Sequence, residues 1–307
     1  MLRILESISP VFLVIGLGYL SRRMGFIPDA FIQSANRLVY YIAIPILVFG
    51  EISAGHFSES FDLLQISGTF LAVVIIMSIG LLTAVILRLS PGGSATFVQG
   101  SFHGNLGYVG LAVVFYTLGP SGRGAASVLA GFLILFQNLI SISLYTFLQA
   151  RGRRLDGGLA WKFLGNPIIL ATVLGLFSSA FGFSLPGFID RSFTIVGDMA
   201  LPLALLIIGG SLKRAPTRRI QLVCLSTFFK LILLPFCGFL VFRIMGVSLP
   251  QAAVAVILLA SPSATISYVM AAEMGGESDL AAAAVTVSTV LSIATYTLWI
   301  SVTGAGI

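Results

Sequence analysis

The stretch Gly104-Asn105-Leu106-Gly107-Tyr108-Val109-Gly110 decides the fold, because glycines and an asparagine interrupt a long, uncharged and otherwise apolar segment. Glycine destabilises a helix interior by about 1 kcal/mol relative to alanine, so this stretch predicts a break. A second uncharged segment is interrupted by Ser261-Pro262-Ser263-Ala264-Thr265, where the proline removes a helical hydrogen bond. In lipid, irregular backbone is tolerated only where protein or a water-filled cavity satisfies the freed polar groups. The two stretches therefore predict two broken helices beside a cavity.

The composition indicates that these breaks lie within a membrane. Of the 307 residues, 57% are hydrophobic and 9% are charged, whereas soluble domains carry roughly 25% charged residues. The mean hydropathy is +1.05. The net charge of +6 does not indicate a nucleic-acid-binding protein, because no basic stripe lies on a soluble fold. The chain is thus predicted to be an all-α polytopic membrane protein with the lipid bilayer as its surroundings.

Apolar runs of about 20 residues, which suffice to cross a bilayer, divide the chain into ten predicted transmembrane helices. These helices cover approximately residues 8–21, 31–50, 63–87, 94–118, 124–148, 160–182, 192–212, 219–242, 250–272 and 280–303. The two interrupted stretches fall in the fourth and the ninth helix. Cys224 and Cys237 share one apolar stretch and predict neither a disulfide framework nor a metal site.

Basic residues are divided unevenly between the two sides of the predicted membrane. One set of loops holds four of them, and the other set holds twelve: Arg22, Arg23, Arg37, Arg88, Arg151, Arg153, Arg154, Lys162, Lys213, Arg214, Arg218 and Arg219. Because cytoplasmic loops carry the excess of lysine and arginine, the loop 151–162 is predicted to be cytoplasmic and both termini to lie outside. The predicted location is the plasma membrane, as the inner membrane of a bacterium.

An internal repeat is visible at corresponding helices of the two halves. Ala43-Ile44-Pro45-Ile46-Leu47 in the second helix is echoed by Ala200-Leu201-Pro202-Leu203-Ala204 in the seventh. Tyr108-Val109 in the fourth is echoed by Tyr268-Val269 in the ninth. Five helices per half is an odd number, so the halves 1–150 and 151–307 are predicted to be inverted relative to each other, as in many secondary transporters.

Paired breaks in equivalent helices point to a binding site, where half-helix N-termini and free N–H groups suit an anion. Asn105 is the leading candidate ligand, because its amide both donates and accepts. For the glycines the alternative is close helix packing, and for the hydroxyls it is bonding to their own helix backbone. The other candidate binding residues are Ser101, His103, Gly104, Gly107, Tyr108, Asn138, Ser261, Pro262, Ser263 and Thr265.

Three ionisable residues lie at membrane depth. His103 could titrate near physiological pH or be a satisfied structural histidine. Asp198 and Lys230 are costly to bury and are therefore functional candidates. Their opposite charges favour a structural ion pair, and the alternative is that they serve the cavity or ion coupling.

Three stretches in this order resemble the auxin efflux carrier family: GNLGYVGL at 104–111, GDMALPLALLIIGGSL at 197–212 and SPSATISYVMA at 261–271. That family includes the plant PIN proteins and bacterial malate- or malonate-permease-like members. The resemblance covers essentially the whole chain. One departure is Ala112, since the family commonly has a proline shortly after the Asn-Gly segment of the fourth helix.

The resemblance implies that the broken fourth and ninth helices cross. It also implies a moving transport domain made of helices 3–5 and 8–10, and a scaffold made of helices 1, 2, 6 and 7. Transport by an elevator-type motion and a homodimeric assembly follow from the same resemblance.

The leading functional hypothesis is a secondary transporter that moves a small organic anion, a carboxylate, and binds it at the crossover without a cofactor. The alternative is a Na⁺- or H⁺-coupled exchanger or symporter of the bile-acid-symporter or cation-antiporter type. The crossover stretches contain no carboxylate, which disfavours that alternative. An intramembrane aspartyl protease would need two membrane aspartates, and Asp198 alone qualifies. ATP-driven transport is unsupported, because the chain has no G-x-x-x-x-G-K-[ST] loop.

Overall fold

The computed structural model describes residues 2–54, 62–149, 167–183, 185–212 and 219–305, and these ranges are almost entirely helical. Of the three π-helical turns, η1 (Val39–Ala43) and η3 (Phe229–Leu233) join helices that follow one another directly, and η2 (Leu106–Gly110) leads directly into the helix that follows it. The helices are α1 (Leu2–Arg23), α2 (Asp29–Leu38), α3 (Ile44–Ala54), α5 (Leu63–Ile86), α6 (Pro91–Phe102), α7 (Leu111–Leu118), α8 (Pro120–Gln149), α10 (Pro167–Ala180), α11 (Gly187–Ser211), α12 (Ile220–Phe228), α13 (Leu234–Ile244), α14 (Leu249–Leu259), α15 (Ile266–Glu273) and α16 (Ser278–Thr303).

The lengths of these helices fit a multi-pass membrane protein. Six described segments are long and apolar enough to cross a bilayer: Asp29–Ser53, Leu63–Ile86, Gly122–Gln149, Gly187–Ser211, Ile220–Ile244 and Ser278–Thr303. The predicted fourth and ninth helices are not among them, because each is divided into two shorter pieces. The count of ten spans and the division into halves 1–150 and 151–307 stay predictions, and the basic loop 151–162 lies outside the described residues.

Polar side chains next to the helix starts satisfy the first backbone N–H groups, which have no partner inside a helix. The Asp62 carboxylate accepts from Leu64 N at 2.9 Å and from Gln65 N at 3.1 Å, which fixes the start of α5. The Ser90 hydroxyl accepts from Gly93 N at 3.1 Å at the start of α6. The beginnings of these two helices can therefore be traced to their local sequence.

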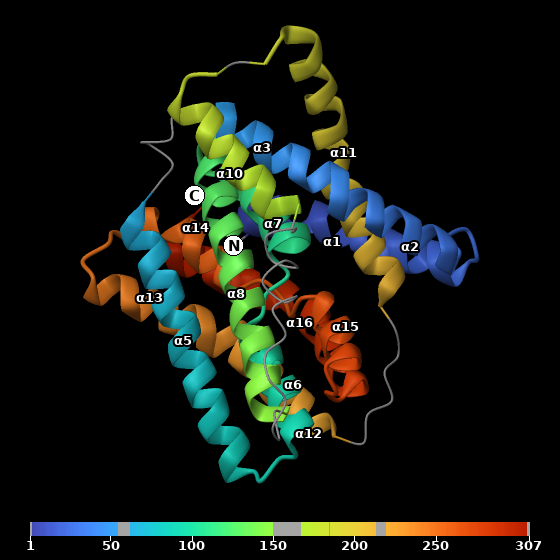
Figure 1. Cartoon of the computed structure of the whole chain (residues 1–307), viewed down its shortest axis with the longest axis vertical. Helices are drawn as coiled ribbons and strands as arrows, with labels where there is room; N and C mark the ends of the chain where they lie inside the picture. The colour runs from blue at the N-terminus through green and yellow to red at the C-terminus, as the bar shows by residue number, and fades with distance from the viewer. Residues whose placement is uncertain (1, 55–61, 150–166, 184, 213–218, 306–307) are drawn as a thin grey trace.

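The helices form two groups that meet at the middle of the molecule. In the first group α1 packs along α11, and α3 packs against both α10 and α11, in the upper part of Figure 1. The second group occupies the lower part, where α6 contacts α5, α8, α12 and α16. Helix α8 runs through the centre and contacts both α3 and α6. The breaks between α6 and α7 and between α14 and α15 lie where the two groups approach each other.

Glycines allow the closest contact in the first group, between α1 and α11. A Cβ atom at Gly209 would lie 1.9 Å from the carbonyl oxygen of Ile15, and one at Gly18 would lie 2.2 Å from the carbonyl oxygen of Leu206. Small residues let helix backbones approach closely in a membrane, where packing and not hydrophobic burial drives helix association. This contact therefore depends on the absence of side chains at two positions.

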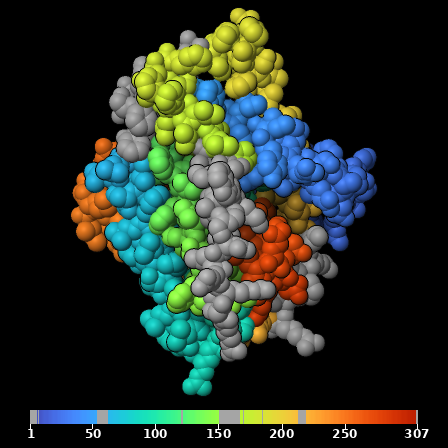
Figure 2. All heavy atoms as spheres, in the orientation of Figure 1, coloured from blue at the N-terminus to red at the C-terminus, as the bar shows by residue number. Residues whose placement is uncertain are grey.

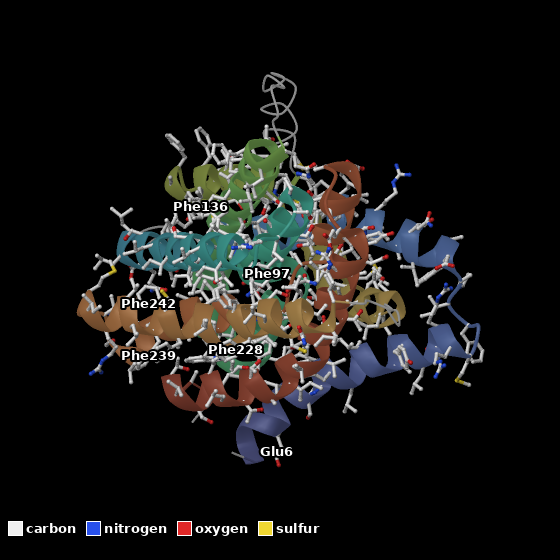
Figure 3. All side chains as sticks on the ribbon, turned by 90° about the horizontal axis from the view of Figure 1, so that it is seen from below. Glu6, Phe97, Phe136, Phe228, Phe239 and Phe242 are labelled. Carbon is white, nitrogen blue, oxygen red and sulfur yellow. The ribbon has the colours of Figure 1, made fainter. Side chains whose placement is uncertain are left out.

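The outer faces of the helices are apolar, as a lipid environment requires. Figure 2 shows α5 at the surface beside α8, and Leu71, Ile79, Leu82 and Val85 are exposed along α5. The interior is also apolar, with Phe97 of α6 fully buried in the middle of the helix layers in Figure 3. Several of the polar residues buried among these layers lie at the two breaks, among them His103, Asn105, Ser261 and Ser263.

Candidate functional site

The predicted fourth helix breaks at residues 103–105. Helix α6 ends at Phe102, and the helical path resumes only at the π-helical turn η2. The carbonyl oxygen of Asn105 accepts hydrogen bonds from Val109 N at 3.2 Å and Gly110 N at 2.9 Å, so the new helical segment is anchored on the asparagine. This break is made without a proline, in keeping with Ala112 at the position where the resembling family commonly has one.

The predicted ninth helix breaks between Leu259 and Ile266, and the two breaks are bonded to each other. Asn105 N donates to the carbonyl oxygen of Pro262 at 2.7 Å, and Ala264 N donates to the carbonyl oxygen of His103 at 2.9 Å. These bonds form an isolated antiparallel bridge between Gly104 and Ser263. Each break therefore satisfies backbone groups that the other has released, as irregular backbone at membrane depth requires.

Gly104 is required at the crossing point because there is no room for a side chain. A Cβ atom there would lie 2.3 Å from Ser261 Oγ and 3.3 Å from Lys230 Nζ. Gln137 of α8 holds the same point from the other side. Its Oε1 accepts from Gly104 N at 2.9 Å, and its Nε2 donates to the carbonyl oxygen of Phe102 at 3.1 Å. The crossover is thus fixed by a glycine and by a glutamine amide.

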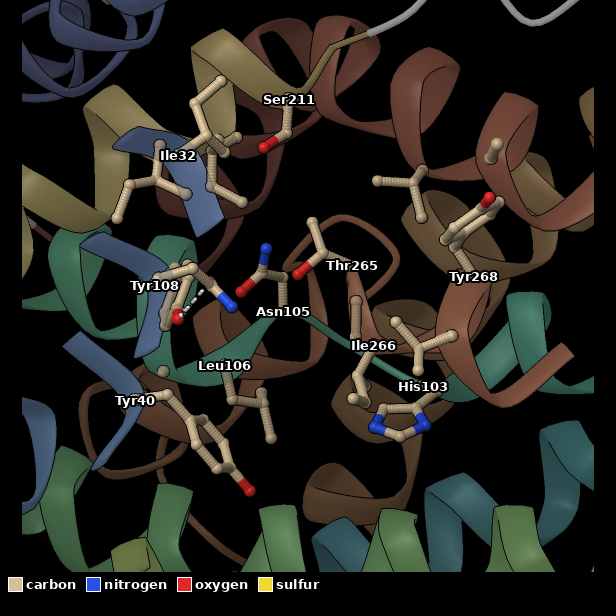
Figure 4. A pocket seen from close by; sticks show the side chains of 18 of the residues that line it. Ile32, Tyr40, His103, Asn105, Leu106, Tyr108, Ser211, Thr265, Ile266 and Tyr268 are labelled. Carbon is tan, nitrogen blue, oxygen red and sulfur yellow. Dashed lines mark hydrogen bonds between the residues drawn. The ribbon is translucent and has the colours of Figure 1, made fainter. Parts of the chain in front are cut away.

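A cavity of about 580 Å³ opens beside the crossover, and Figure 4 shows side chains that line it. It also reaches α2, where Tyr108 OH donates to Asn36 Oδ1 at 2.7 Å. Tyr108 belongs to η2 and Asn36 to α2, so this bond joins the crossover to the first helix group. The predicted binding residues in its lining are His103, Gly104, Asn105, Gly107, Tyr108, Asn138 and Thr265.

Asn105 is the polar residue that stands out in this cavity. Its side chain is 6% exposed, and its Nδ2 has no hydrogen-bond partner among the described residues. Figure 4 shows it beside Thr265, which comes from the other break. A buried donor without a partner costs about 1–3 kcal/mol, so such groups are rare in native structures and require an explanation. A bound acceptor would supply the missing hydrogen bond.

Comparison with known proteins identifies the family. A model of the family described as membrane transport protein matches residues 3–158 and 154–300. The chain belongs to the membrane transport protein family. Its relatives include a Rhizobium meliloti protein named "putative malonate transporter", 28% identical over 97% of this chain and 95% of the relative. An uncharacterized transporter of Methanocaldococcus jannaschii is 23% identical over 96% of this chain and 97% of the relative.

These findings confirm the family resemblance seen in the sequence and establish that the chain is a membrane transporter and not an enzyme. An uncharacterized transporter of Methanothermobacter thermautotrophicus is similar over a comparable length, with 24% identity over 96% of each chain. The match runs through both breaks and both helix groups, so the crossover and its cavity belong to the part of the chain that the family shares.

Four predicted binding residues of this membrane transport protein lie outside the cavity lining, within the crossover itself. Ser101 Oγ donates to the carbonyl oxygen of Phe97 at 2.8 Å, which is the backbone bonding considered as its alternative role. Ser263 Oγ donates to the carbonyl oxygen of Gly100 at 3.1 Å. Pro262 contributes its carbonyl oxygen to Asn105 N, and Ser261 Oγ is buried without a partner among the described residues.

The expected ion pair between Asp198 and Lys230 is wrong. Lys230 is fully buried, and its Nζ donates to the carbonyl oxygen of Leu259 at 2.7 Å, at the end of α14. Asp198 is exposed on α11 and lies near Glu51 of α3, with which it interacts electrostatically. The two residues therefore belong to different helix groups. The prediction failed because proximity in sequence says nothing about which helices pack together.

The charges in the cavity lie away from its buried end. Asp29 and Asp279 are the acidic residues in the lining, both are exposed, and Asp29 pairs with Arg22. Among the described residues, no lysine or arginine lines the cavity. His103 and Asn105, by contrast, are 3% and 6% exposed. The buried end is thus polar without a fixed charge in its lining.

Sequence reasoning missed several residues that the structure brings to this site. Gln99 and Ser141 contact His103, and Asn36 contacts Tyr108. Gln137 and Asn138 are adjacent in the sequence, yet they have different places in the structure. Gln137 forms a hydrogen bond with Gly104 at the crossover, and Asn138 lines the cavity. Helical periodicity separates adjacent residues by about 100°, but it does not identify which of the two faces the break.

Proposed function

We propose that this membrane transport protein is a secondary transporter of a small organic anion, a carboxylate, which binds at the crossover of the two broken helices. The observation that carries the proposal is the buried Nδ2 of Asn105, a hydrogen-bond donor without a partner among the described residues, in the lining of the cavity. A carboxylate has acceptor oxygens alone, and it is therefore the complement of such a donor.

The polarity of the two half-helices supports an anion at the same place. The segment η2–α7 begins at Leu106 and α15 begins at Ile266, next to the lining residues Asn105 and Thr265. A helix N-terminus presents unpaired N–H groups and the positive end of the helix dipole. Such termini bind carboxylates and phosphates without a basic side chain. This agrees with a lining that contains no lysine or arginine among the described residues.

The substrate class is proposed to be a small dicarboxylate. Support comes from the Rhizobium relative, whose name refers to malonate and which matches this chain over nearly its full length. The cavity of about 580 Å³ lies within the range of small-molecule sites, about 300–1,000 Å³.

The transport mechanism is proposed to be an elevator-type motion in an inverted five-plus-five repeat, within a homodimer. The group containing α5–α8 and α12–α16 would move as the transport domain against the scaffold of α1–α3, α10 and α11. The hydrogen bond from Tyr108 to Asn36 joins the two groups at the cavity, so it would have to break when the transport domain moves.

Uptake of labelled malonate into proteoliposomes tests the proposed function. Purified protein should take up malonate above the level of empty liposomes, and unlabelled dicarboxylates should compete better than monocarboxylates. The measurement is repeated with and without imposed Na⁺ and pH gradients, which separates this proposal from the ion-coupled exchanger. Na⁺-dependent uptake of a cation or a bile-acid-like solute, with no uptake of any dicarboxylate, would contradict the proposal.

The proposed orientation places both termini outside the cell and the 151–162 loop in the cytoplasm. It rests on the excess of basic residues on one side. Reporter tags inserted at residue 155 and attached to the C-terminus should report opposite sides of the plasma membrane. Tags on the same side would rule out an odd number of spans after residue 155, and with it the inverted repeat.

A further inference from the structure

The imidazole of His103 is held on one edge by two neighbours, and its other edge is left without a partner. Its Nδ1 lies 2.9 Å from Ser141 Oγ of α8 and 3.3 Å from Gln99 Nε2 of α6. The side chain is 3% exposed and lines the cavity. No described residue forms a hydrogen bond with Nε2. The chemistry that His103 offers the cavity therefore depends on which ring nitrogen carries the proton.

Gln99 settles this question, because its own orientation is fixed by two other residues. Its Nε2 lies 3.0 Å from Met270 Sδ, and its Oε1 accepts from Tyr145 OH at 3.0 Å. A thioether sulfur accepts and cannot donate, so the atom facing it must be the amide NH₂. That same NH₂ faces His103 Nδ1 at 3.3 Å, and the Ser141 hydroxyl, which can donate, lies 2.9 Å from the same nitrogen, so we assign Nδ1 as an acceptor without a proton. The neutral ring consequently carries its proton on Nε2.

The supporting residues are themselves anchored. Thr96 Oγ1 donates to the carbonyl oxygen of Gly92 at 2.9 Å and accepts from Glu277 N at 2.9 Å. Tyr145 OH has two acceptors within reach, Gln99 Oε1 at 3.0 Å and Thr96 Oγ1 at 3.3 Å, and the contact with Gln99 is the shorter one. The residues that fix His103 thus come from α6, α8 and α15, and are linked to the loop that precedes α16.

We propose that His103 binds the carboxylate of the substrate through Nε2–H as a neutral donor, and that Gln99 and Met270 fix this tautomer. This proposal rests on the proposed function, since it concerns the same cavity. Anion binding then involves no protonation of His103, because a second proton at Nδ1 would face the Gln99 NH₂ and break that bond. Gln99 and Met270 are positioning residues, whereas His103 contacts the substrate.

The charged groups around the ring agree with a neutral histidine. Lys230 of η3 lies next to Gly104, and a positive charge on its amine disfavours a positive charge on the imidazole. Asp279 of α16 lines the cavity but is exposed, so its charge faces water. Glu277 is paired with Arg219 at 2.8 Å. Tyr145 of α8 faces Gln99 and not the ring itself.

The tautomer can be measured without any substrate. The chain has two histidines, His56 and His103, so His56→Gln leaves one histidine for ¹⁵N-histidine NMR of the protein in lipid. We expect a protonated Nε2 and an unprotonated Nδ1, unchanged between pH 6 and pH 8. A protonated Nδ1, or a ring that takes up a second proton within that range, would overturn the proposal whether or not malonate is transported.

Transport by variants tests the binding role. His103→Gln keeps an amide donor near the Nε2 position, so its apparent affinity for malonate should fall less than that of His103→Leu, with the same pH profile as the parent. His103→Leu removes the donor, and apparent affinity should fall about tenfold to hundredfold, as expected for a lost hydrogen bond to a charged group. Equal affinity in His103→Leu and the parent would overturn the role of His103 and leave the proposed function standing.

Gln99→Glu tests the positioning role, because a carboxylate oxygen would face Nδ1 and draw a proton to it. We expect the NMR signal to change to a protonated Nδ1, and malonate uptake to become dependent on an imposed pH gradient. Unchanged Nε2 protonation in a folded Gln99→Glu variant would overturn the assignment of Gln99. If the parent itself takes up no dicarboxylate, the binding role of His103 fails together with the proposed function, and the tautomer measurement still decides the geometry.

Discussion

Asn105 N donates to the carbonyl oxygen of Pro262 at 2.7 Å, which joins two residues from opposite halves of the chain. Neither break would be tolerated alone in lipid, because each would leave backbone groups without partners. The cavity beside them is therefore a joint product of the two breaks. Substitutions at the crossover should consequently affect folding and transport together. The exception is a substitution that removes a side-chain atom with no hydrogen bond to the rest of the crossover.

Asn105→Ala removes such an atom, because Nδ2 makes no bond within the described protein. We expect the variant to express and melt like the parent, while apparent affinity for malonate falls about tenfold to hundredfold. Asn105→Asp should be worse, since it places a like charge against the carboxylate in a low dielectric. Proteoliposome uptake and thermal unfolding in detergent provide the measurements. Tighter binding by the aspartate variant would indicate a cationic ligand.

Gly104→Ala and Gly107→Ala form a matched pair at the same crossover. A Cβ atom at Gly104 would lie 2.3 Å from Ser261 Oγ, whereas one at Gly107 would meet Ile44 Cδ1 at 3.7 Å, an ordinary contact. Overpacking a tight site costs about 1–3 kcal/mol, so Gly104→Ala should lower the melting temperature and reduce transport. Gly107→Ala should melt like the parent. Equal melting temperatures for the two variants would mean that the backbones are less closely apposed than the structure indicates.

Lys230→Met tests the role of the buried lysine as the partner of the Leu259 carbonyl. The substitution leaves the buried carbonyl oxygen of Leu259 without this hydrogen bond, which costs about 1–3 kcal/mol, and methionine keeps the apolar length of the side chain. We expect a lower melting temperature than the parent. Arg243→Met, at an exposed position at the end of α13, is the control and should change little. Combining Lys230→Met with Asp198→Asn should give additive losses, because the two residues form no pair.

Gly209→Ala tests the close contact of α1 and α11. The added methyl group would lie 1.9 Å from the carbonyl oxygen of Ile15, so the two helices must separate and the protein should lose stability. Gly16→Ala lies on α1 with no other atom within 4 Å, and it should be neutral or stabilising. The comparison of melting temperatures in detergent checks the pair. A smaller loss for Gly209→Ala than for Gly16→Ala would contradict the packing.

The sequence by itself determined the membrane class, the positions of the two breaks and the residues of the crossover. It could do so because these features are local: an uncharged apolar run of a given length forms a helix in lipid, and Gly104 or Pro262 interrupts it wherever it lies. The family resemblance and the transporter class followed from the same stretches, and both are confirmed by the comparisons.

The tertiary structure alone decided which side chains meet. Lys230 contacts Leu259 and not Asp198, Ser263 bonds to Gly100 and not to the cavity, and Gln99 orients His103 through Met270. The direction of a side chain at a helix break depends on the backbone path across the break, which is fixed by bonds to the other half of the chain. Such contacts join residues far apart in the sequence, so no local pattern encodes them.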